Sequence, residues 1–169
     1  MDQNQTMRTC DTLLLSAADG QQALQKAGQL IRQGGLVAFP TETVYGLGAN
    51  ALDPQAVRGI FAAKGRPQDN PLIIHLEDAS QTALYAKNIP PVYYRLCEQF
   101  SPGPLTIILP KRENIPLETS GGLDTVAVRI PSHPVARQII HWAGVPVAAP
   151  SANLSGSPSP TIAEHCVND

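Results

Sequence analysis

The sequence predicts an α/β domain built on a mixed sheet. Segments patterned as helices and segments patterned as strands intermix along the whole chain instead of separating into blocks. They do not follow a regular βαβ spacing, which favours a sheet with both parallel and antiparallel pairs over a fully parallel one. The 169 residues are 43% hydrophobic and contain no repeat or linker, so one domain with one sizeable core is expected.

The first part of the chain combines a polar terminus, a helix and two short strands. Residues 1–12 are polar and are expected to be a disordered N-terminus, with the domain over residues 13–169. A helix is expected to start at Asp19, a suitable N-cap, and to continue to about Gln33, before two glycines that stop it. Apolar segments on either side of this helix predict strands over residues 13–15 and 36–39.

The rest of the chain alternates helices, strands and polar loops. The segment TETVYGLGANALD is expected to be a loop, after which Asp53 and Pro54 are the N-cap and first residue of a helix that ends at Gly65. Further strands are predicted over residues 72–76, 105–109, 125–130 and 145–149. Further helices are predicted over residues 79–86, 92–100 and 135–143. Polar loops are predicted over residues 66–70, 111–123 and 150–161.

Composition excludes several classes of protein. The net charge of −2 argues against a protein that coats nucleic acid by bulk electrostatics, although a local basic groove stays open. The three cysteines are far apart and form no CxxC pair, so neither a zinc site nor a disulfide framework is indicated. The N-terminus lacks the apolar run of a signal peptide and no segment approaches the length of a membrane span, so a cytoplasmic protein without membrane association is expected.

Common nucleotide-binding and hydrolytic motifs are missing. There is no GxxxxGK[ST] phosphate loop, and Gly46-Leu47-Gly48 lacks the third glycine of a dinucleotide fingerprint. HExxH and GxSxG are absent as well. A nucleotide site in this chain would therefore need a different arrangement of residues.

Polar side chains gather in loops next to the short predicted strands, where ligands bind in open α/β sheets. Lys64 and Arg66 flank Gly65 at a helix C-terminus, and two interpretations are open: they complement the helix dipole, or they clamp a phosphate. Gly46 and Gly48 suggest that the backbone there approaches something small. Other polar residues of these loops are equally compatible with plain turns: Thr41, Glu42, Thr43, Asn70, Ser151 and Asn153.

Two ionisable residues lie inside predicted strands. His75 follows an apolar run and is more typical of a satisfied interior histidine than of a catalyst. Alternation places Val126 and Val128 on one face of their strand and Arg129 on the other. An arginine there must meet water, an acid or an anionic ligand. The residues alone therefore predict an α/β domain with a polar, partly cationic pocket for a small anionic ligand.

Five strings extend this prediction: PTETVYGLGANALD, KGRPQDNPLIIHL, SPGPLTIIL, TVAVRIPSHP and APSANLSGSPSPT. In this order, covering most of residues 30–161, they resemble the YrdC/TsaC family of threonylcarbamoyl-AMP synthases. The resemblance implies an open twisted mixed sheet with flanking helices and a deep, positively lined cavity. Relatives usually continue beyond SPSPT, so this domain is expected to lack the usual C-terminal end.

The resemblance also implies an activity. The family joins L-threonine, bicarbonate and ATP into threonylcarbamoyl-adenylate, releasing pyrophosphate and water. A separate threonylcarbamoyl transferase complex then forms N6-threonylcarbamoyladenosine in ANN-decoding tRNA. Mg²⁺ is expected to accompany ATP, with no metal site of the protein's own and no tightly bound organic cofactor.

Matching positions give the expected site residues. The threonine pocket is expected to consist of Thr43, His75, Arg129 and the backbone at Ala149. The ATP side is expected to include Arg66, Asn70, Thr125, Ser151 and Ser159. The family's KxR…SxN signature, expected to carry catalysis, corresponds to Lys64, Arg66, Ser151 and Asn153.

Two other functions remain open at this stage. A domain of this fold is also linked to double-stranded RNA and ribosome maturation, so tRNA or double-stranded RNA binding is an alternative, which the net charge weakens. A similar domain performs a carbamoyl-adenylate step in hydrogenase maturation within larger proteins.

Overall fold

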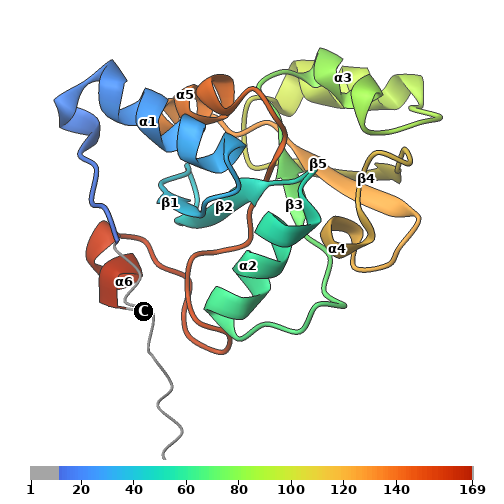
Figure 1. The fold of residues 1–169 in the computed structure, drawn as a ribbon. Coiled ribbons are helices and arrows are strands. Elements are labelled where there is room, and N and C mark those ends of the chain that lie inside the picture. Colours follow the sequence, from blue (N-terminus) through green and yellow to red (C-terminus); the bar gives the residue numbers. More distant parts are fainter. Residues whose placement is uncertain (1–11, 169) are drawn as a thin grey trace, which may run out of the picture.

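A six-stranded sheet runs through the molecule, with helices on both faces (Figure 1). The computed structural model describes residues 12–168, so the expected disorder of residues 1–12 falls outside them except for Thr12. The strand order is β1-β2-β6-β3-β5-β4. β3 and β5 are parallel, and every other neighbouring pair is antiparallel. The predicted mixed sheet is therefore confirmed.

Most elements are short, in keeping with the short apolar runs of the sequence. The strands are β1 (Val37–Phe39), β2 (Gly46–Asn50), β3 (Ile73–His75), β4 (Thr106–Pro110), β5 (Thr125–Arg129) and β6 (Val147–Ala148). The α-helices are α1 (Gln21–Arg32), α2 (Pro54–Lys64), α3 (Pro91–Phe100), α4 (Leu117–Ser120), α5 (Pro134–Ala143) and α6 (Ala163–Asn168). Two 3₁₀ helices are η1 (Ala17–Asp19) and η2 (Ala79–Leu84).

The helix α2 has the ends that the sequence predicts. Oδ1 of Asp53 accepts hydrogen bonds from the backbone N–H groups of Gln55 (2.8 Å) and Ala56 (3.3 Å), and Pro54 is the first helical residue. Gly65 ends the helix with φ of 57°, a left-handed conformation that glycine adopts without steric cost. These contacts fix where Lys64 and Arg66 leave the helix.

Several local predictions are wrong. The predicted loop after β1 contains the strand β2, which has neighbours on both sides, β1 and β6, so pairing outweighs the weak strand propensity of its glycines. Residues 13–15 form no strand, and Asp19 lies in η1 while Gly20 occupies the N-cap position of α1. The predicted helix over residues 79–86 is the 3₁₀ helix η2, and the predicted loop over residues 111–123 contains the short helix α4.

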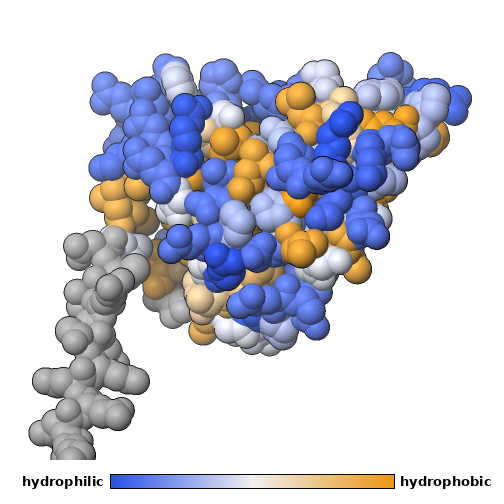
Figure 2. Space-filling view, turned by 45° about the vertical axis from the view of Figure 1, so that its right-hand side comes forward, coloured by the Kyte–Doolittle hydropathy of each residue, from blue (hydrophilic) through white to orange (hydrophobic). Residues whose placement is uncertain are grey.

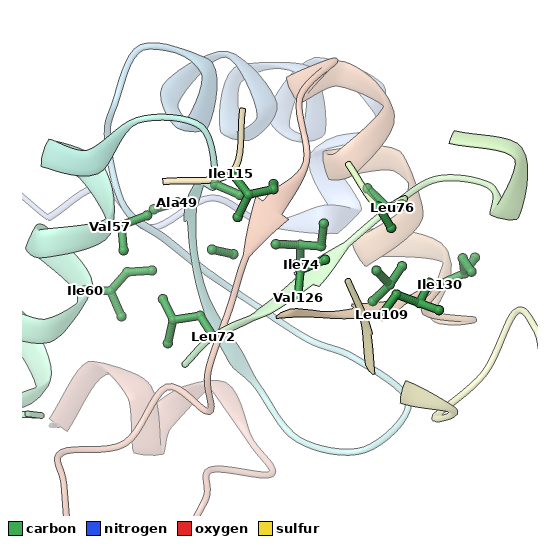
Figure 3. Packing of buried hydrophobic residues seen from close by; sticks show 14 of the residues in the cluster. Ala49, Val57, Ile60, Leu72, Ile74, Leu76, Leu109, Ile115, Val126 and Ile130 are labelled. Atoms are coloured by element: carbon green, nitrogen blue, oxygen red, sulfur yellow. The ribbon is translucent and has the colours of Figure 1, made fainter. Parts of the chain in front are cut away.

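Two hydrophobic clusters cover opposite faces of the sheet. The larger one packs α2 and α3 against the strands, and Figure 3 shows Val57 and Ile60 of α2 pointing toward the side chains of the sheet. The smaller one packs α1 and α5, which lie side by side in Figure 1, against Phe39 of β1 and Val147 of β6. Each cluster removes apolar area from water and so stabilises the fold.

The second face of the sheet is covered over only part of its width. Within residues 12–168, the smaller cluster contains no side chain of β3, β4 or β5. On that face Ile108 of β4 is 69% exposed, and its register partner Ala127 of β5 is half-buried. We call this part of the sheet, formed by β3, β5 and β4 and lying outside the smaller cluster, the open face.

The surface mixes both kinds of side chain. Figure 2 shows hydrophobic areas between hydrophilic ones on the face in view. Among the described residues, no helix is both long enough and apolar enough to cross a membrane.

Candidate active site

A polar row crosses the open face. The register places His75 of β3 between Val147 of β6 and Arg129 of β5, and Arg129 pairs in turn with Thr106 of β4. Paired residues of neighbouring strands point to the same face, so His75, Arg129 and Thr106 are adjacent. The burial of β5 confirms the predicted alternation, since Val126 and Val128 are 2% exposed in the core on the other face.

Arg129 meets an acid, one of the three partners that its position predicts. Its Nη2 donates to Oε1 of Glu42 at 2.8 Å and to Oγ1 of Thr43 at 3.2 Å. Its Nε lies 3.4 Å from the carbonyl oxygen of Gly103. The side chains of Arg129 and Glu42 are only 11% and 19% exposed, so the ion pair is largely shielded from water.

Glu42 is in turn tied to the backbone before α5. Its Oε2 accepts hydrogen bonds from the N–H groups of Ser132 (3.2 Å) and His133 (3.4 Å). Burial by itself raises the pKa of the Glu42 carboxyl, but the hydrogen bond from Arg129, hydrogen bonds from backbone N–H groups and the charge of Arg129 outweigh burial and lower the pKa below its ordinary value. Glu42 is therefore ionised at neutral pH.

His75 is an interior residue beside this pair. It is 3% exposed, and its Nδ1 lies 3.3 Å from the carbonyl oxygen of Val147. Burial, with the positive charge of Arg129 next to it, lowers the pKa of His75 from 6.5 to about 4. The imidazole is therefore neutral at physiological pH, able to donate or accept a hydrogen bond without adding charge to the site.

Lys64 is buried and faces the loop after β6. Its Nζ donates hydrogen bonds to the backbone carbonyl oxygens of Ser151 and Asn153. The residue is only 4% exposed. The backbone of the same residue accepts a hydrogen bond from the N–H of Ser155 at 2.9 Å. Lys64 thus joins the C-terminus of α2 to residues 151–155.

Two buried polar atoms near that junction have no partner. Nε of Arg66 and Oδ1 of Asn153 make no hydrogen bond to any residue within 12–168. Asn153 is 7% exposed, and its Nδ2 already donates to the carbonyl oxygens of Leu154 and Ser157, both at 2.8 Å. Burial lowers the pKa of Arg66. An unsatisfied cationic donor and an unsatisfied acceptor are what a ligand carrying both anionic and donor groups would satisfy.

The turn after β1 connects the two ends of the site. The backbone of Tyr45 accepts from the N–H of Ala152 and donates to the carbonyl oxygen of Pro160, both at 2.8 Å. Gly46 and Ser151 form an isolated antiparallel bridge. Because residues 41–46 also carry Glu42 and Thr43, this turn runs from Arg129 to the loop that Lys64 anchors.

The expected site residues thus lie on connected segments, to different degrees. The structure brings together Thr43, His75 and Arg129 at one end, and Lys64, Ser151 and Asn153 at the other. Ala149 is buried and its N–H donates to the carbonyl oxygen of Ile73 at 3.0 Å. Thr125 lies on the same face of β5 as Arg129, at the far end of the strand. Asn70 and Ser159 are exposed, and within residues 12–168 no side-chain hydrogen bond or ion pair ties them to the other site residues.

Sequence reasoning missed Glu42 and misread Gly48. In the sequence, Glu42 was compatible with a plain turn. The signal that could have pointed to a role in the site was its place between two threonines shortly after a predicted strand. At Gly48 the close approach is to protein, since a Cβ would lie 2.5 Å from Cε1 of Phe39 and 2.9 Å from Cγ1 of Val147. At Gly46 a Cβ would meet Ala149 at an ordinary 3.4 Å. Packing between strands therefore explains Gly48.

Cavities and metal ligands give less information about this site. Two cavities lie elsewhere in the described part of the chain, one of about 420 Å³ beside Gln21 and Trp142 and one of about 230 Å³ beside Asp78 and Cys97. A deep cavity at the open face stays a prediction. Over residues 12–168, no three His, Cys, Asp or Glu side chains are placed to hold a metal ion.

Comparisons with known proteins agree with this geometry. A family model described as telomere recombination (Sua5/YciO/YrdC) matches residues 29–169. The chain is 59% identical over 143 residues to threonylcarbamoyl-AMP synthase of Pyrococcus abyssi, covering 85% of this chain and 42% of the relative. It is 52% identical over 156 residues to threonylcarbamoyl-AMP synthase of Bacillus subtilis, covering 92% of this chain and 44% of the relative.

A solved structure supports the same likeness. The crystal structure of P. abyssi Sua5 complexed with L-threonine superposes with a TM-score of 0.87 at 56% identity, covering 89% of this chain and 44% of that one. The chain therefore spans less than half the length of these relatives.

Proposed function

The chain belongs to the Sua5/YciO/YrdC family, and on that basis we propose that it is a threonylcarbamoyl-AMP synthase. The proposed reaction joins L-threonine, bicarbonate and ATP into threonylcarbamoyl-adenylate, with release of pyrophosphate and water. Its product would supply a threonylcarbamoyl transferase complex that modifies ANN-decoding tRNA. The observation that carries the proposal is the polar row of His75 and Arg129 on an open sheet face, connected through one turn to the loop anchored by Lys64.

The end at Arg129 suits a small amino acid. A guanidinium that is held in place is a strong partner for a carboxylate, because it donates parallel hydrogen bonds in a fixed plane. Thr43 and the neutral His75 lie beside it and offer polar contacts without further charge. Ile73 and Ala127 pair next to this polar row on the same face and offer an apolar surface for a methyl group. L-Threonine combines these features, and a relative 56% identical was crystallised with it.

The end at α2 suits a polyphosphate nucleotide. The unsatisfied Nε of Arg66 is a donor for a phosphate oxygen, and the unsatisfied Oδ1 of Asn153 is an acceptor for a ribose hydroxyl or an exocyclic amine. Ser151 adds a hydroxyl next to the same anchored carbonyls. Lys64, Arg66, Ser151 and Asn153 carry the proposed catalytic role, with Asn70, Thr125 and Ser159 as further proposed ATP contacts.

The chemistry needs positioning and charge neutralisation more than a nucleophile. The amine of threonine adds to bicarbonate-derived CO₂, giving a carbamate, whose oxygen then attacks the α-phosphorus of ATP while pyrophosphate leaves. The reacting groups are both anionic, so a site that aligns them and offsets their repulsion supplies the rate enhancement. Arg129 would hold the carboxylate of threonine and Arg66 the phosphates of ATP.

Mg²⁺ is proposed to enter with ATP and not through a protein site. The described residues place no three acidic, histidine or cysteine side chains together, so phosphate oxygens and water would be its ligands. Neutralising the triphosphate is the chemistry that the ion would supply. No organic cofactor is needed for the proposed reaction.

The test is product formation by the chain itself. The protein would be incubated with ATP, Mg²⁺, bicarbonate and L-threonine, with pyrophosphate measured continuously and threonylcarbamoyl-adenylate identified by mass. Release that depends on L-threonine and on bicarbonate is expected, with D-threonine as the matched control. Pyrophosphate release that is the same without threonine, from a folded chain, would contradict the proposal.

A further inference from the structure

We infer that Glu42 is a positioning residue, whose carboxylate holds the guanidinium of Arg129 in the orientation that receives the carboxylate of the amino-acid substrate. The inference rests on the proposed function and adds to it a residue that lies outside the expected site. Glu42 does not itself contact the substrate in this proposal. It acts through Arg129.

The two oxygens of Glu42 have separate tasks. Oε1 accepts from Nη2 of Arg129, while Oε2 accepts from the backbone N–H groups of Ser132 and His133, directly before α5. A carboxylate held at both oxygens cannot turn without losing hydrogen bonds, each of which contributes to stability. The backbone at the start of α5 therefore fixes the position of the guanidinium through Glu42.

One nitrogen of the Arg129 guanidinium stays available for a ligand. Nη2 is engaged by Glu42 and Thr43, and Nε lies near the carbonyl oxygen of Gly103, whereas Nη1 has no hydrogen-bond partner within the described part of the chain. A planar guanidinium whose one edge is fixed presents its remaining donors in a defined direction. The pair is largely buried, so this direction is not averaged by free rotation in water.

The pair also sets the charge of this end of the site. Glu42 is ionised and offsets Arg129, and His75 is neutral at physiological pH. A substrate carboxylate is therefore bound by directed hydrogen bonds from a fixed donor and not by excess positive charge. The orientation of the Arg129 guanidinium consequently matters more for binding than it would in a strongly cationic pocket.

The first test replaces Glu42 by glutamine, which has nearly the same size and retains one oxygen acceptor. We expect Glu42→Gln to raise the KM for L-threonine about 10-fold, since a charge-assisted hydrogen bond is lost from Arg129. The KM for ATP should change less than about twofold, because within residues 12–168 neither Glu42 nor Arg129 hydrogen-bonds to a residue of the nucleotide end. Glu118→Gln is the matched control, since Glu118 forms an ion pair with Arg58 at the surface.

A double-mutant cycle separates positioning from a general structural role. In the Arg129→Ala background, Glu42→Gln should cause no further rise in the KM for L-threonine, because the residue through which it acts is gone. Glu42→Asp, too short to reach both Arg129 and the backbone, should behave like Glu42→Gln. Additive effects in the cycle, or equal rises in the KM for threonine and for ATP, would overturn the inference.

A direct binding measurement distinguishes failure of the proposed function from failure of the role of Glu42. Calorimetry with L-threonine on the unmodified chain should give binding, and Glu42→Gln should weaken it about 10-fold. If the unmodified chain neither binds threonine nor forms product, the proposed function fails and the inference with it. If the unmodified chain binds threonine and Glu42→Gln binds it equally well, the proposed function stands and the role of Glu42 is refuted.

Discussion

The ammonium group of Lys64 donates a hydrogen bond to the backbone carbonyl oxygen of Ser151, 87 residues further along the chain. The same ammonium group donates a second hydrogen bond to the carbonyl oxygen of Asn153. Lys64 is only 4% exposed, so both hydrogen bonds are buried. A buried lysine is costly unless its charge is compensated, and carbonyl dipoles provide that compensation here. The contact therefore fixes residues 151–155 against α2.

Replacing Lys64 by methionine should reduce stability as well as activity. The thioether fills similar space but donates nothing, so two carbonyl oxygens lose a charged donor, which predicts a loss of about 2–3 kcal/mol of unfolding free energy. Urea denaturation measures this loss. Lys26→Met on the exposed side of α1 is the control and should stay within about 0.5 kcal/mol of the unmodified chain. Equal stability of both variants would show that Lys64 does not anchor the loop.

Arg66 should behave in the opposite way. Its Nε is buried and makes no hydrogen bond within the part of the chain that the structure describes, so Arg66→Ala removes an unsatisfied group and should leave the unfolding free energy nearly unchanged. The KM for ATP should rise at least about 10-fold, because a charge-assisted contact to phosphate is lost. Arg58→Ala, which removes an exposed arginine of α2, is the control for charge. A large loss of stability in Arg66→Ala would favour a structural role instead.

Gly48 gives a prediction about the sheet. Alanine at this position places a methyl group 2.5 Å from the ring of Phe39 and 2.9 Å from Val147, both in the core, so Gly48→Ala should cost about 1–3 kcal/mol. Gly59→Ala in α2 is the matched control, because its methyl group would meet Leu36 at an ordinary 3.6 Å. Removing a helical glycine should raise stability by about 0.5–1 kcal/mol. If the denaturation midpoints of both variants shifted in the same direction from that of the unmodified chain, this account would be contradicted.

The sequence predicts best where local chemistry decides the outcome. The helix α2 has its cap, first proline and terminal glycine where Asp53, Pro54 and Gly65 place them, because these preferences act within one turn of the chain. The alternation of β5 likewise follows from Val126 and Val128 alone. The class of sheet and the geometry of these elements needed no knowledge of distant contacts.

Three of the misses depend on partners that are distant in the sequence. β2 is rich in glycine and becomes a strand because β1 and β6 pair with it on both sides. Glu42 resembles any turn acid until Arg129, 87 residues later, reaches its carboxylate. Lys64 offered two interpretations, a helix-dipole contact or a phosphate clamp, and neither includes the carbonyls of a loop that begins after β6. Local pattern cannot supply such contacts, because tertiary pairing brings them about.

His75 predicts how stability depends on pH. In the native state its pKa is about 4, whereas the ordinary value is 6.5, so the unfolded chain takes up a proton at a pH where the folded chain does not. Stability is therefore complete above pH 6.5 and falls as the pH drops toward 4. Between pH 7 and pH 5, this single residue should account for a loss of about 2 kcal/mol.

The variant His75→Asn tests this dependence directly. Asparagine can still donate to the carbonyl oxygen of Val147 but does not titrate, so the loss between pH 7 and pH 5 should be smaller than in the unmodified chain by about 2 kcal/mol. Urea denaturation at both pH values gives the two slopes, with His165→Asn on the exposed part of α6 as the control that keeps the original dependence. The range stops at pH 5 because the lowered pKa of Glu42 makes a second group lose its stabilising effect below that. An identical pH dependence in His75→Asn and in the unmodified chain would mean that the pKa of His75 is not lowered in the folded state, so that the site beside Arg129 gains a positive charge as the pH falls below 6.5.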